Sequence, residues 1–362
     1  MKVIAYYLPQ FYENENNNKW WGKGFTEWTN TKKAKPLFKN HYQPREPYQQ
    51  DYYDLSDIST MRKQAELAKQ YGVYGFSIYH YWFGNGERML DIPEKNLLKH
   101  PEIDLNYCLC WANEAWSRRW DGSEKEILME QDYGTEEYWI NHFNYLLPFF
   151  KDKRYICDEG HPIFIIYRPE LIPFMRDMMN CWNELALKNG LQEICFVFQH
   201  APYWYGEYEN TGFTYGIESQ PSLALYPAVG LKNKFKLIFD DPYRILFAIR
   251  SVFSKRPFRL CNYDHIWKMI LKREPLSKIS IPCAFTDWDN TPRVGKHGIA
   301  FKGASPEKFK KYFGELVKKN KEKYKKDYIF INAWNEWGEG AYLEPDERYG
   351  YAYLEAIKEV IG

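Results

Sequence analysis

Short runs of apolar, β-branched and aromatic residues recur along the chain, and each is bounded by turn residues. Runs of this length and composition predict buried strands. The sequence holds eight of them, at residues 3–8, 75–79, 105–111, 162–167, 194–199, 215–219, 281–286 and 328–332. Polar loops or segments with helical spacing follow the runs, so strands and helices are predicted to alternate to the end of the chain.

The segments between the strands have the spacing of amphipathic helices. Ile58, Met61, Ala65 and Ala68 fall largely on one face before Gly72 ends the first helix. Further helices are predicted at 136–149, 175–188, 306–319 and 351–360. Buried strands that alternate with helices predict a parallel sheet, and eight strands fit a closed (β/α)₈ TIM barrel better than an open doubly wound sheet. No glycine-rich phosphate loop follows the first strand, which counts against a Rossmann fold.

The 362 residues fit one α/β barrel with long βα loops, so we predict a single catalytic domain over 1–362. A basic segment between the sixth and seventh strands departs from the barrel pattern. Residues 232–273 carry eleven Lys or Arg against three Asp, and apolar residues at 245–253 have helical spacing. This predicts a helical insertion at about 226–276 that packs on its own barrel. The alternative is a basic amphipathic surface that contacts anionic lipid or an anionic glycan.

Charge and composition narrow the function. Lys and Arg total 49 against 48 Asp and Glu, so no global field attracts nucleic acid. The apolar run at the N-terminus is too short for a signal peptide, and no run reaches the roughly 18 apolar residues needed to span a bilayer. We therefore expect a cytoplasmic protein, located peripherally at the inner membrane face if the basic segment binds lipid. The seven cysteines lack the paired spacings of a zinc site and are interpreted as reduced core thiols.

Aromatic residues make up 19% of the chain. Flat amphipathic rings stack on sugar faces, which makes carbohydrate a candidate ligand. A tyrosine-rich core explains the same composition equally well.

Polar and aromatic side chains gather at the carboxyl ends of the predicted strands. In a TIM barrel these ends meet on one face and form the active site. We therefore predict a concave site lined by Tyr7, Gln10, Trp28, Tyr79, His80, Trp82, Trp111, Asn113, Glu114, Tyr167, Arg168, His200, Glu218, Asp287, Trp288, Trp334, Asn335 and Trp337. A sugar ring needs a flat apolar face, so at least two rings should be exposed there among Trp82, Trp111, Trp116, Trp288, Trp334 and Trp337.

Glu336 and Glu339 are the candidate catalytic residues. They lie three residues apart just after the last predicted strand, between tryptophans and glycines. Glycosidic-bond chemistry needs one carboxyl group to protonate the leaving oxygen and a second to act as nucleophile, base or electrostatic partner. Two like charges held close together raise one pKa, which keeps one carboxyl group protonated near neutrality. Acidic residues on an exposed final loop are the alternative interpretation.

Several separate motifs together resemble the WbsX-like proteins: AYYLPQF at 5–11, GFTEWTN at 24–30, HYQP at 41–44, WANE at 111–114 and WNEWGEG at 334–340. The WbsX-like proteins are usually described as glycosyltransferases of surface-polysaccharide gene clusters. They are related to glycoside hydrolase family 99, which contains endo-α-mannosidases and mannanases. The resemblance implies a (β/α)₈ barrel and a retaining mechanism without metal or cofactor. Carried over by position, Glu336 would assist the sugar 2-hydroxyl, which displaces the leaving group, and Glu339 would be the general acid/base.

These expectations favour an enzyme that cleaves or transfers a glycosyl unit, of α-mannoside type by resemblance, in bacterial surface polysaccharide or lipopolysaccharide metabolism. Its partner would be an oligosaccharide or a lipid-linked glycan. A sugar-nucleotide-dependent glycosyltransferase of O-antigen biosynthesis is the first alternative, because Asp287 and Asp289 have the Asp-x-Asp spacing of a diphosphate metal site. A non-catalytic glycan-binding barrel is the second. The sequence leaves the oligomeric state open.

Overall fold

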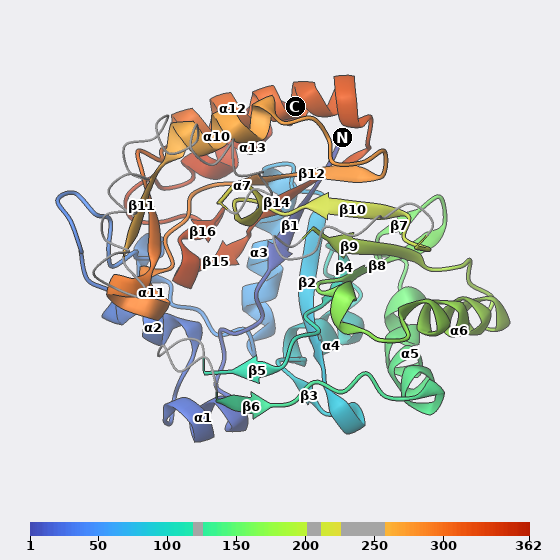
Figure 1. Cartoon of the computed structure of the whole chain (residues 1–362). Coiled ribbons are helices and arrows are strands. Elements are labelled where there is room, and N and C mark those ends of the chain that lie inside the picture. Colours follow the sequence, from blue (N-terminus) through green and yellow to red (C-terminus); the bar gives the residue numbers. More distant parts are fainter. Residues whose placement is uncertain (119–125, 201–210, 226–257) are drawn as a thin grey trace, which may run out of the picture.

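The computed structural model describes residues 1–118, 126–200, 211–225 and 258–362, and their core is a closed parallel barrel (Figure 1). The barrel strands are paired in the order β1–β14–β12–β10–β9–β8–β4–β2, and β2 pairs again with β1. Their bounds are β1 (Lys2–Tyr7), β2 (Gly75–Trp82), β4 (Asn106–Trp111), β8 (His161–Ile166), β9 (Cys195–Gln199), β10 (Tyr215–Glu218), β12 (Ser280–Phe285) and β14 (Tyr328–Asn332). All eight predicted strands are present, and the predicted (β/α)₈ TIM barrel is confirmed.

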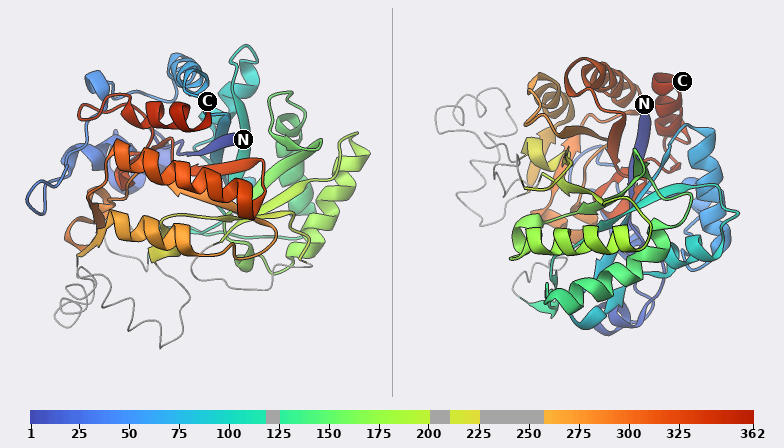
Figure 2. Two further views of the ribbon diagram at one scale, coloured as in Figure 1. Left: turned by 90° about the horizontal axis from the view of Figure 1, so that it is seen from above. Right: turned by 90° about the vertical axis from the view of Figure 1, so that its right-hand side faces the viewer.

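Helices surround the barrel, as the two further views in Figure 2 show. The predicted helices form with nearly the predicted bounds; α6 and α12 agree to the residue. Asp57 and Ser305 cap α3 and α12 by accepting hydrogen bonds from backbone N–H groups of the first turn. The longer helices are α3 (Ile58–Gln70), α4 (Ile92–Lys99), α5 (Glu136–Phe150), α6 (Met175–Lys188), α10 (Tyr263–Lys272), α12 (Pro306–Lys319) and α13 (Ala352–Ile361). Between β9 and β10, the described residues contain no helix.

Smaller elements lie in the loops that connect strands and helices. The long loop after β1 contains α1 (Glu15–Trp21), α2 (Glu27–Lys33) and η1 (Tyr48–Gln50). Two antiparallel hairpins matter for the site: β5 (Trp116–Ser117) with β6 (Ile127–Met129), and β15 (Asn335–Glu336) with β16 (Ala341–Tyr342), which flank η7 (Trp337–Glu339). The others are β3 (Arg88–Met89), β7 (Cys157–Asp158), β11 (Arg259–Asn262), β13 (Ile299–Lys302), α7 (Ser222–Leu225), α11 (Thr291–Val294), η2 (Gly84–Gly86), η4 (Pro169–Leu171), η5 (Gly295–His297) and η6 (Asn320–Tyr324).

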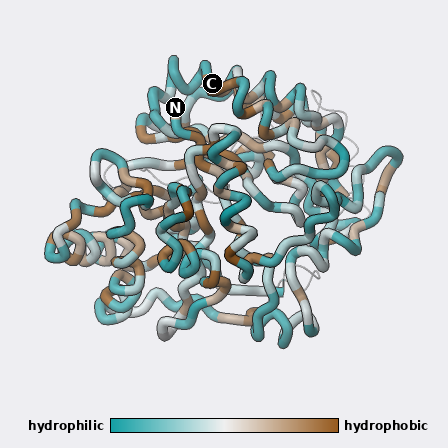
Figure 3. Tube along the Cα trace, turned by 180° about the vertical axis from the view of Figure 1, so that it is seen from behind, coloured by the Kyte–Doolittle hydropathy of each residue, from teal (hydrophilic) through white to brown (hydrophobic). Residues whose placement is uncertain are grey.

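Residues inside the barrel alternate with residues that face the helices. Tyr6 points inward, where its ring stacks on Tyr79 at 5.7 Å and contacts Phe330 at 5.6 Å. Tyr7 points outward and donates a hydrogen bond to Gln64 of α3 at 2.8 Å. Apolar residues follow the buried strands while the outer faces of the helices are hydrophilic (Figure 3). The seven cysteines are unpaired; five are buried in the core as expected, whereas Cys157 and Cys181 are only half-buried.

The basic segment is described only at its C-terminal end, because residues 226–257 lie outside the described residues. In the described end, β11 pairs with β13, and α10 buries Tyr263, Ile266, Trp267 and Ile270. The Trp267 ring stacks on Tyr312 of α12 at 5.7 Å, so this part packs on the barrel. The interpretation of 232–257 as a packed insertion or as a lipid- or glycan-binding surface stays a prediction. Within the described parts of the chain, no helix is long and apolar enough to cross a membrane.

Candidate active site

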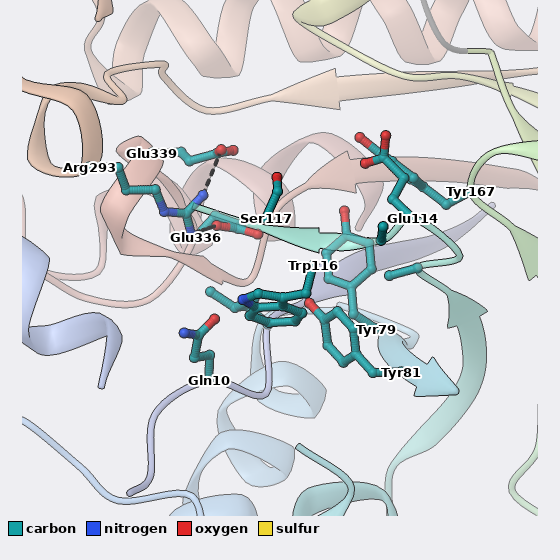
Figure 4. Close-up of a pocket in the computed structure, with 13 residues that line it drawn as sticks. Gln10, Tyr79, Tyr81, Glu114, Trp116, Ser117, Tyr167, Arg293, Glu336 and Glu339 are labelled. Atoms are coloured by element: carbon teal, nitrogen blue, oxygen red, sulfur yellow. Dashed lines mark hydrogen bonds and ion pairs between the residues drawn. The ribbon is translucent and has the colours of Figure 1, made fainter. Parts of the chain in front are cut away.

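A cavity of about 230 Å³ opens at the carboxyl ends of the barrel strands (Figure 4). Its wall combines residues that follow β1, β4 and β8 with residues of β2, β5, α11 and the last hairpin. The lining residues are Leu8, Gln10, Tyr79, Tyr81, Ala112, Glu114, Ala115, Trp116, Ser117, Tyr167, Arg293, Glu336 and Glu339. This is the face on which TIM barrels carry their active sites.

Glu336 and Glu339 lie on the segment 334–344, which we call the catalytic turn. Its base is fixed to the barrel: the Trp334 N–H donates to the Tyr6 carbonyl at 2.7 Å, and the Leu343 N–H donates to the Trp334 carbonyl at 2.9 Å. The Glu339 carbonyl accepts from the Asp289 N–H at 2.6 Å. The turn is therefore held at both ends and along its length.

Glu344 anchors the turn from behind. Its carboxylate accepts hydrogen bonds from Nε1 of Trp334 at 3.0 Å, Nε1 of Trp337 at 2.7 Å, Tyr53 Oη at 2.8 Å and Gln64 Nε2 at 2.7 Å. Burial raises the pKa of Glu344 to about 7, and these four donated hydrogen bonds oppose the rise. Both tryptophans are fully buried and thus support the catalytic turn from inside the protein.

Arg293 of α11 binds three carboxylates at once. Its Nη2 donates to Glu336 Oε2 at 2.8 Å, its Nη1 to Glu339 Oε1 at 2.6 Å, and its Nε to Glu27 Oε1 at 2.8 Å. Because one guanidinium bridges Glu336 and Glu339, the two carboxylates meet on the same side of the cavity. Figure 4 shows Arg293, Glu336 and Glu339 across the cavity from Tyr79 and Tyr81 of β2.

The three carboxylates carry more negative charge than one guanidinium neutralises. Burial, together with the charges of Glu336 and Glu27, raises the pKa of Glu339 to about 8 against the opposing effect of Arg293. The Glu339 side chain is nevertheless 23% exposed to the cavity, against 8% for Glu336. At neutral pH the site therefore holds a protonated carboxyl group within reach of a ligand.

The opposite wall is aromatic. Tyr79, Tyr81 and Tyr167 line it together with Trp116, whose ring lies 5.1 Å from that of Tyr81. Of the six tryptophans predicted to supply rings, only Trp116 lines this cavity. Trp82, Trp111, Trp334 and Trp337 are buried and Trp288 is half-buried outside the lining, so the expectation of two exposed tryptophans is wrong. Tyrosines supply the remaining rings.

Six of the twenty predicted site residues line the cavity: Gln10, Tyr79, Glu114, Tyr167, Glu336 and Glu339. The other fourteen lie outside the lining, and several of them use their polar atoms for internal contacts. Asn335 exchanges two hydrogen bonds with the Leu8 backbone at 2.7 and 3.0 Å, and Asn113 does the same with Arg168 at 2.7 Å each. Arg168 itself pairs with Glu114 and Glu170. Tyr7 faces α3, and Trp28 donates to the Tyr53 carbonyl at 2.9 Å.

Three more predicted residues, His80, Trp82 and Trp111, belong to a buried network of contacts outside the cavity lining. His80 Nδ1 lies 3.1 Å from Glu94, and its Nε2 lies 3.0 Å from Nε2 of His142. The Trp82 ring stacks on His142 at 4.5 Å, and Trp111 Nε1 donates to the Trp82 carbonyl at 3.0 Å. These side chains connect β2 and β4 to the surrounding helices.

The remaining predicted residues are also engaged away from the cavity. Glu218 accepts from Arg273, Tyr324 and the Leu276 N–H, which joins β10 to the outer layer. His200 is buried, and burial lowers its pKa to about 4.

The Asp-x-Asp pair is likewise satisfied by internal contacts. Asp287 binds Arg45 Nη2 at 2.7 Å, and Asp289 binds His41 Nε2 at 2.6 Å and Gln43 Nε2 at 2.7 Å. Neither carboxylate lines the cavity. Among the described residues, no group of three or more His, Cys, Asp or Glu side chains is placed to hold a metal ion.

The predicted set of site residues did not include Glu27, Arg293, Tyr81 or Ser117. Tyr81 was detectable, because β2 continues to Trp82 and Tyr81 then lies on the same face as Tyr79. Glu27 stands inside the GFTEWTN motif at 24–30, but nothing in its spacing relates it to Glu336. A single arginine such as Arg293 has no sequence signature, since its role arises only from the fold.

The fold and the cavity define a TIM-barrel protein with paired glutamates and aromatic rings at the carboxyl ends of its strands. The chain belongs to the family described as Glycosyltransferase WbsX, which matches residues 3–357. The expected family is thus confirmed. Over 366 residues the chain is 32% identical to the protein WxcX of Xanthomonas campestris pv. campestris (strain B100), covering 99% of this chain and 49% of WxcX. A WxcX protein from a second strain gives the same identity and coverage. The chain spans about half the length of these curated relatives.

Solved structures with the same fold include the GH99 endo-α-mannosidase from Bacteroides thetaiotaomicron, with a TM-score of 0.56 and 14% identity, covering 99% of this chain and 96% of that one. A glycoside hydrolase-like protein aligns with a TM-score of 0.57 and 13% identity, covering 99% and 93%. At these identities the likeness shows the shared barrel.

Proposed function

We propose that the protein is a carbohydrate-active enzyme that cleaves or transfers a glycosyl unit, with Glu336 and Glu339 as its catalytic pair. The observation that carries the proposal is the pairing of these two carboxylates on one guanidinium inside a cavity whose opposite wall is aromatic. Membership of a family described as glycosyltransferase, and a barrel shared with an endo-α-mannosidase, support the substrate class.

Glu339 is proposed as the general acid/base. Its raised pKa of about 8 keeps it protonated at neutral pH, and its partial exposure to the cavity lets it reach a leaving oxygen. In the first step the Glu339 proton moves to the leaving oxygen as the bond from that oxygen to the anomeric carbon breaks. In the second step the Glu339 carboxylate removes a proton from the incoming water or acceptor hydroxyl.

Glu336 is proposed to accept the proton of the sugar 2-hydroxyl. The freed oxygen attacks the anomeric carbon and forms a 1,2-anhydro sugar. In the second step the incoming oxygen attacks the anomeric carbon, the bond from that carbon to the 2-oxygen breaks, and Glu336 returns its proton to the 2-oxygen, with net retention. Glu336 fits this role because it lies beside Glu339 on the same guanidinium. An acidic cavity also stabilises the positive charge that develops on the sugar ring in the transition state.

A sugar-nucleotide-dependent transferase is the second candidate, and the family description favours it. The described part of the cavity argues against it, because its charged lining residues are three glutamates and one arginine, Arg293, which already binds two of those glutamates, Glu336 and Glu339. A diphosphate would be repelled by this lining. The Asp287 and Asp289 carboxylates are engaged elsewhere.

The substrate proposed is an oligosaccharide or a lipid-linked glycan of a bacterial surface polysaccharide such as lipopolysaccharide, with an α-mannoside as the first to test. Placement in the cytoplasm, at the inner membrane face where lipid-linked glycans are assembled, belongs to the same proposal.

The proposal is tested by incubating the protein with aryl α-glycosides and bacterial polysaccharides and measuring released sugar. Glu336→Gln and Glu339→Gln should each lower turnover of saccharide substrates by about 10²- to 10⁴-fold, the usual contribution of a general acid or base. Glu347→Gln is the matched control, because Glu347 is exposed on a nearby segment. Full activity in both variants, or release of a nucleoside diphosphate from a sugar nucleotide, contradicts the proposal.

The role of the 2-hydroxyl has its own test. A 2-deoxy analogue of a turned-over substrate lacks the internal nucleophile, so the wild-type enzyme should leave it intact. Turnover of the analogue at a rate close to that of the parent sugar contradicts this mechanism while leaving the two glutamates as catalysts.

A further inference from the structure

Glu27 is a third carboxylate in contact with the catalytic pair. It begins α2, far from the catalytic turn in sequence, and its side chain is completely buried. Its Oε1 accepts from Arg293 Nε at 2.8 Å, and its Oε2 has no hydrogen-bond partner within the described residues. A buried carboxylate with one oxygen that lacks a hydrogen bond lowers the stability of the folded protein, which suggests that Glu27 has a function.

The close approach of Glu27 depends on a glycine of the catalytic turn. A Cβ atom at Gly338 would lie 1.7 Å from Glu27 Oε1 and 2.9 Å from Arg293 Nε. Gly338 stands between Glu336 and Glu339, and only a residue without a side chain lets Glu27 and Arg293 pack against it.

We propose that Glu27 is a positioning residue that holds Arg293 between Glu336 and Glu339, so that one guanidinium serves both catalytic carboxylates. This inference rests on the proposed function. An arginine side chain without other constraints frequently binds a single carboxylate through two parallel N–H···O hydrogen bonds. Because Glu27 occupies Nε, neither catalytic glutamate can take that bidentate arrangement through Nε, and each binds one terminal nitrogen.

The binding of Glu336 and Glu339 to separate terminal nitrogens of Arg293 suits the proposed reaction. In the first step Glu339 loses its proton to the leaving oxygen while Glu336 gains the proton of the 2-hydroxyl. The negative charge therefore moves from one end of the guanidinium to the other, and the number of charges around Arg293 stays constant. Arg293 contacts both carboxylates at similar distances, 2.6 and 2.8 Å, so it can stabilise either state without moving.

The negative charge of Glu27 also favours a proton on its neighbours. Glu27 and Glu336 both raise the pKa of Glu339, whereas Arg293 lowers it. Removal of the Glu27 charge should therefore make Glu339 more acidic, and removal of the Arg293 charge should make it less acidic.

The experiment follows Glu339 directly by ¹³C NMR of protein labelled at the glutamate carboxyl carbon. The Glu339 signal is identified by its loss in Glu339→Gln. In Glu27→Gln the titration midpoint should move about one unit to lower pH, and in Arg293→Gln it should move to higher pH. Glu27→Asp retains the charge, so its midpoint should stay near the wild-type value while turnover falls because the shorter side chain no longer holds Arg293.

Glu94→Gln is the matched control, because Glu94 is a buried glutamate outside the catalytic turn that contacts His80 and Tyr145 and not Arg293. It should lower the melting temperature without moving the midpoint. Glu27→Gln is expected to fold, since Arg293 keeps two carboxylate partners. If it does not fold, the opposite shift in Arg293→Gln and the unchanged midpoint in Glu27→Asp still test the inference.

An unchanged Glu339 midpoint in Glu27→Gln, or a shift of the same size in Glu94→Gln, overturns the positioning role. The titration needs no substrate, so its result is independent of the proposed function. A protein that shows the predicted shifts but turns over no glycan would refute the function alone.

Discussion

Glu336 and Glu339 have the same chemistry but different surroundings. Both bind Arg293, yet Glu339 is more exposed and has the raised pKa of about 8. In the proposed mechanism the raised pKa makes Glu339 the acid, a role that depends on its surroundings rather than on its residue type.

The raised pKa of Glu339 predicts the pH dependence of turnover. In the proposed mechanism the acid form of Glu339 is the active one, and a raised pKa means that this form persists up to about pH 8 and is lost above it. We expect kcat/KM to fall as the pH rises through about 8, by about tenfold per unit in the alkaline limb. The measurement is a pH–rate profile on a saccharide substrate. A rate that rises through pH 8 would show that Glu339 does not act as the acid.

At the scale of elements, the catalytic turn joins functional and structural residues in one short segment. Glu336 and Glu339 face the cavity, while Trp334 and Trp337 donate to Glu344 behind it. The two tryptophans of the WNEWGEG motif therefore support the turn from behind and do not line the cavity.

Gly338→Ala tests the packing of this turn. The new Cβ would collide with Glu27 Oε1 at 1.7 Å, so Glu27 and Arg293 must shift away from the catalytic pair. We expect kcat to fall on the order of 10²-fold, as for other small misplacements of catalytic groups. The measurements are kcat and thermal unfolding.

Gly314→Ala provides the control. Gly314 lies inside α12, where a Cβ would meet only Val360 Cγ2 at an ordinary 3.8 Å. Alanine should stabilise the helix by about 0.5–1 kcal/mol and leave turnover unchanged. A Gly338→Ala enzyme as active as Gly314→Ala would mean that the catalytic pair tolerates displacement of Glu27 and Arg293.

Sequence patterns predicted the elements better than the site. The strands and helices were found because their periodicity is local; even α6 and α12 agreed at both ends. At the site, strand-end position brought Glu336, Glu339 and Tyr79 to the cavity correctly. It did not distinguish them from His80 or Asn335, because whether a strand-end side chain points to the cavity or to a neighbouring loop depends on contacts between distant segments.

At the scale of the whole molecule, closure of the barrel joins the two ends of the chain. β1 pairs with β14 on one side and with β2 on the other, and the termini lie close together in Figures 1 and 2. The first and last segments also meet at the site, where Gln10 and Glu27 approach Glu336 and Glu339. The active site therefore requires the complete barrel.

This closure predicts that the chain unfolds as one domain, as the assignment of 1–362 to a single domain requires. Loss of β1 would break pairing with both neighbours, so we expect one cooperative transition, with near-ultraviolet and far-ultraviolet circular dichroism changing together. Two resolved transitions in calorimetry would instead indicate two independently folding units.

The leaving-group dependence of Glu339→Gln is the most direct measurement of the proposed chemistry. An activated aryl or fluoride leaving group needs little protonation, whereas a sugar leaving group needs an acid. We predict that Glu339→Gln retains the first-step release of activated leaving groups, measured in a single turnover, but loses about 10²- to 10⁴-fold on saccharides, and that Glu336→Gln loses both. Equal losses on both kinds of substrate in Glu339→Gln would contradict the assignment of Glu339 as the acid that cleaves the glycosidic bond.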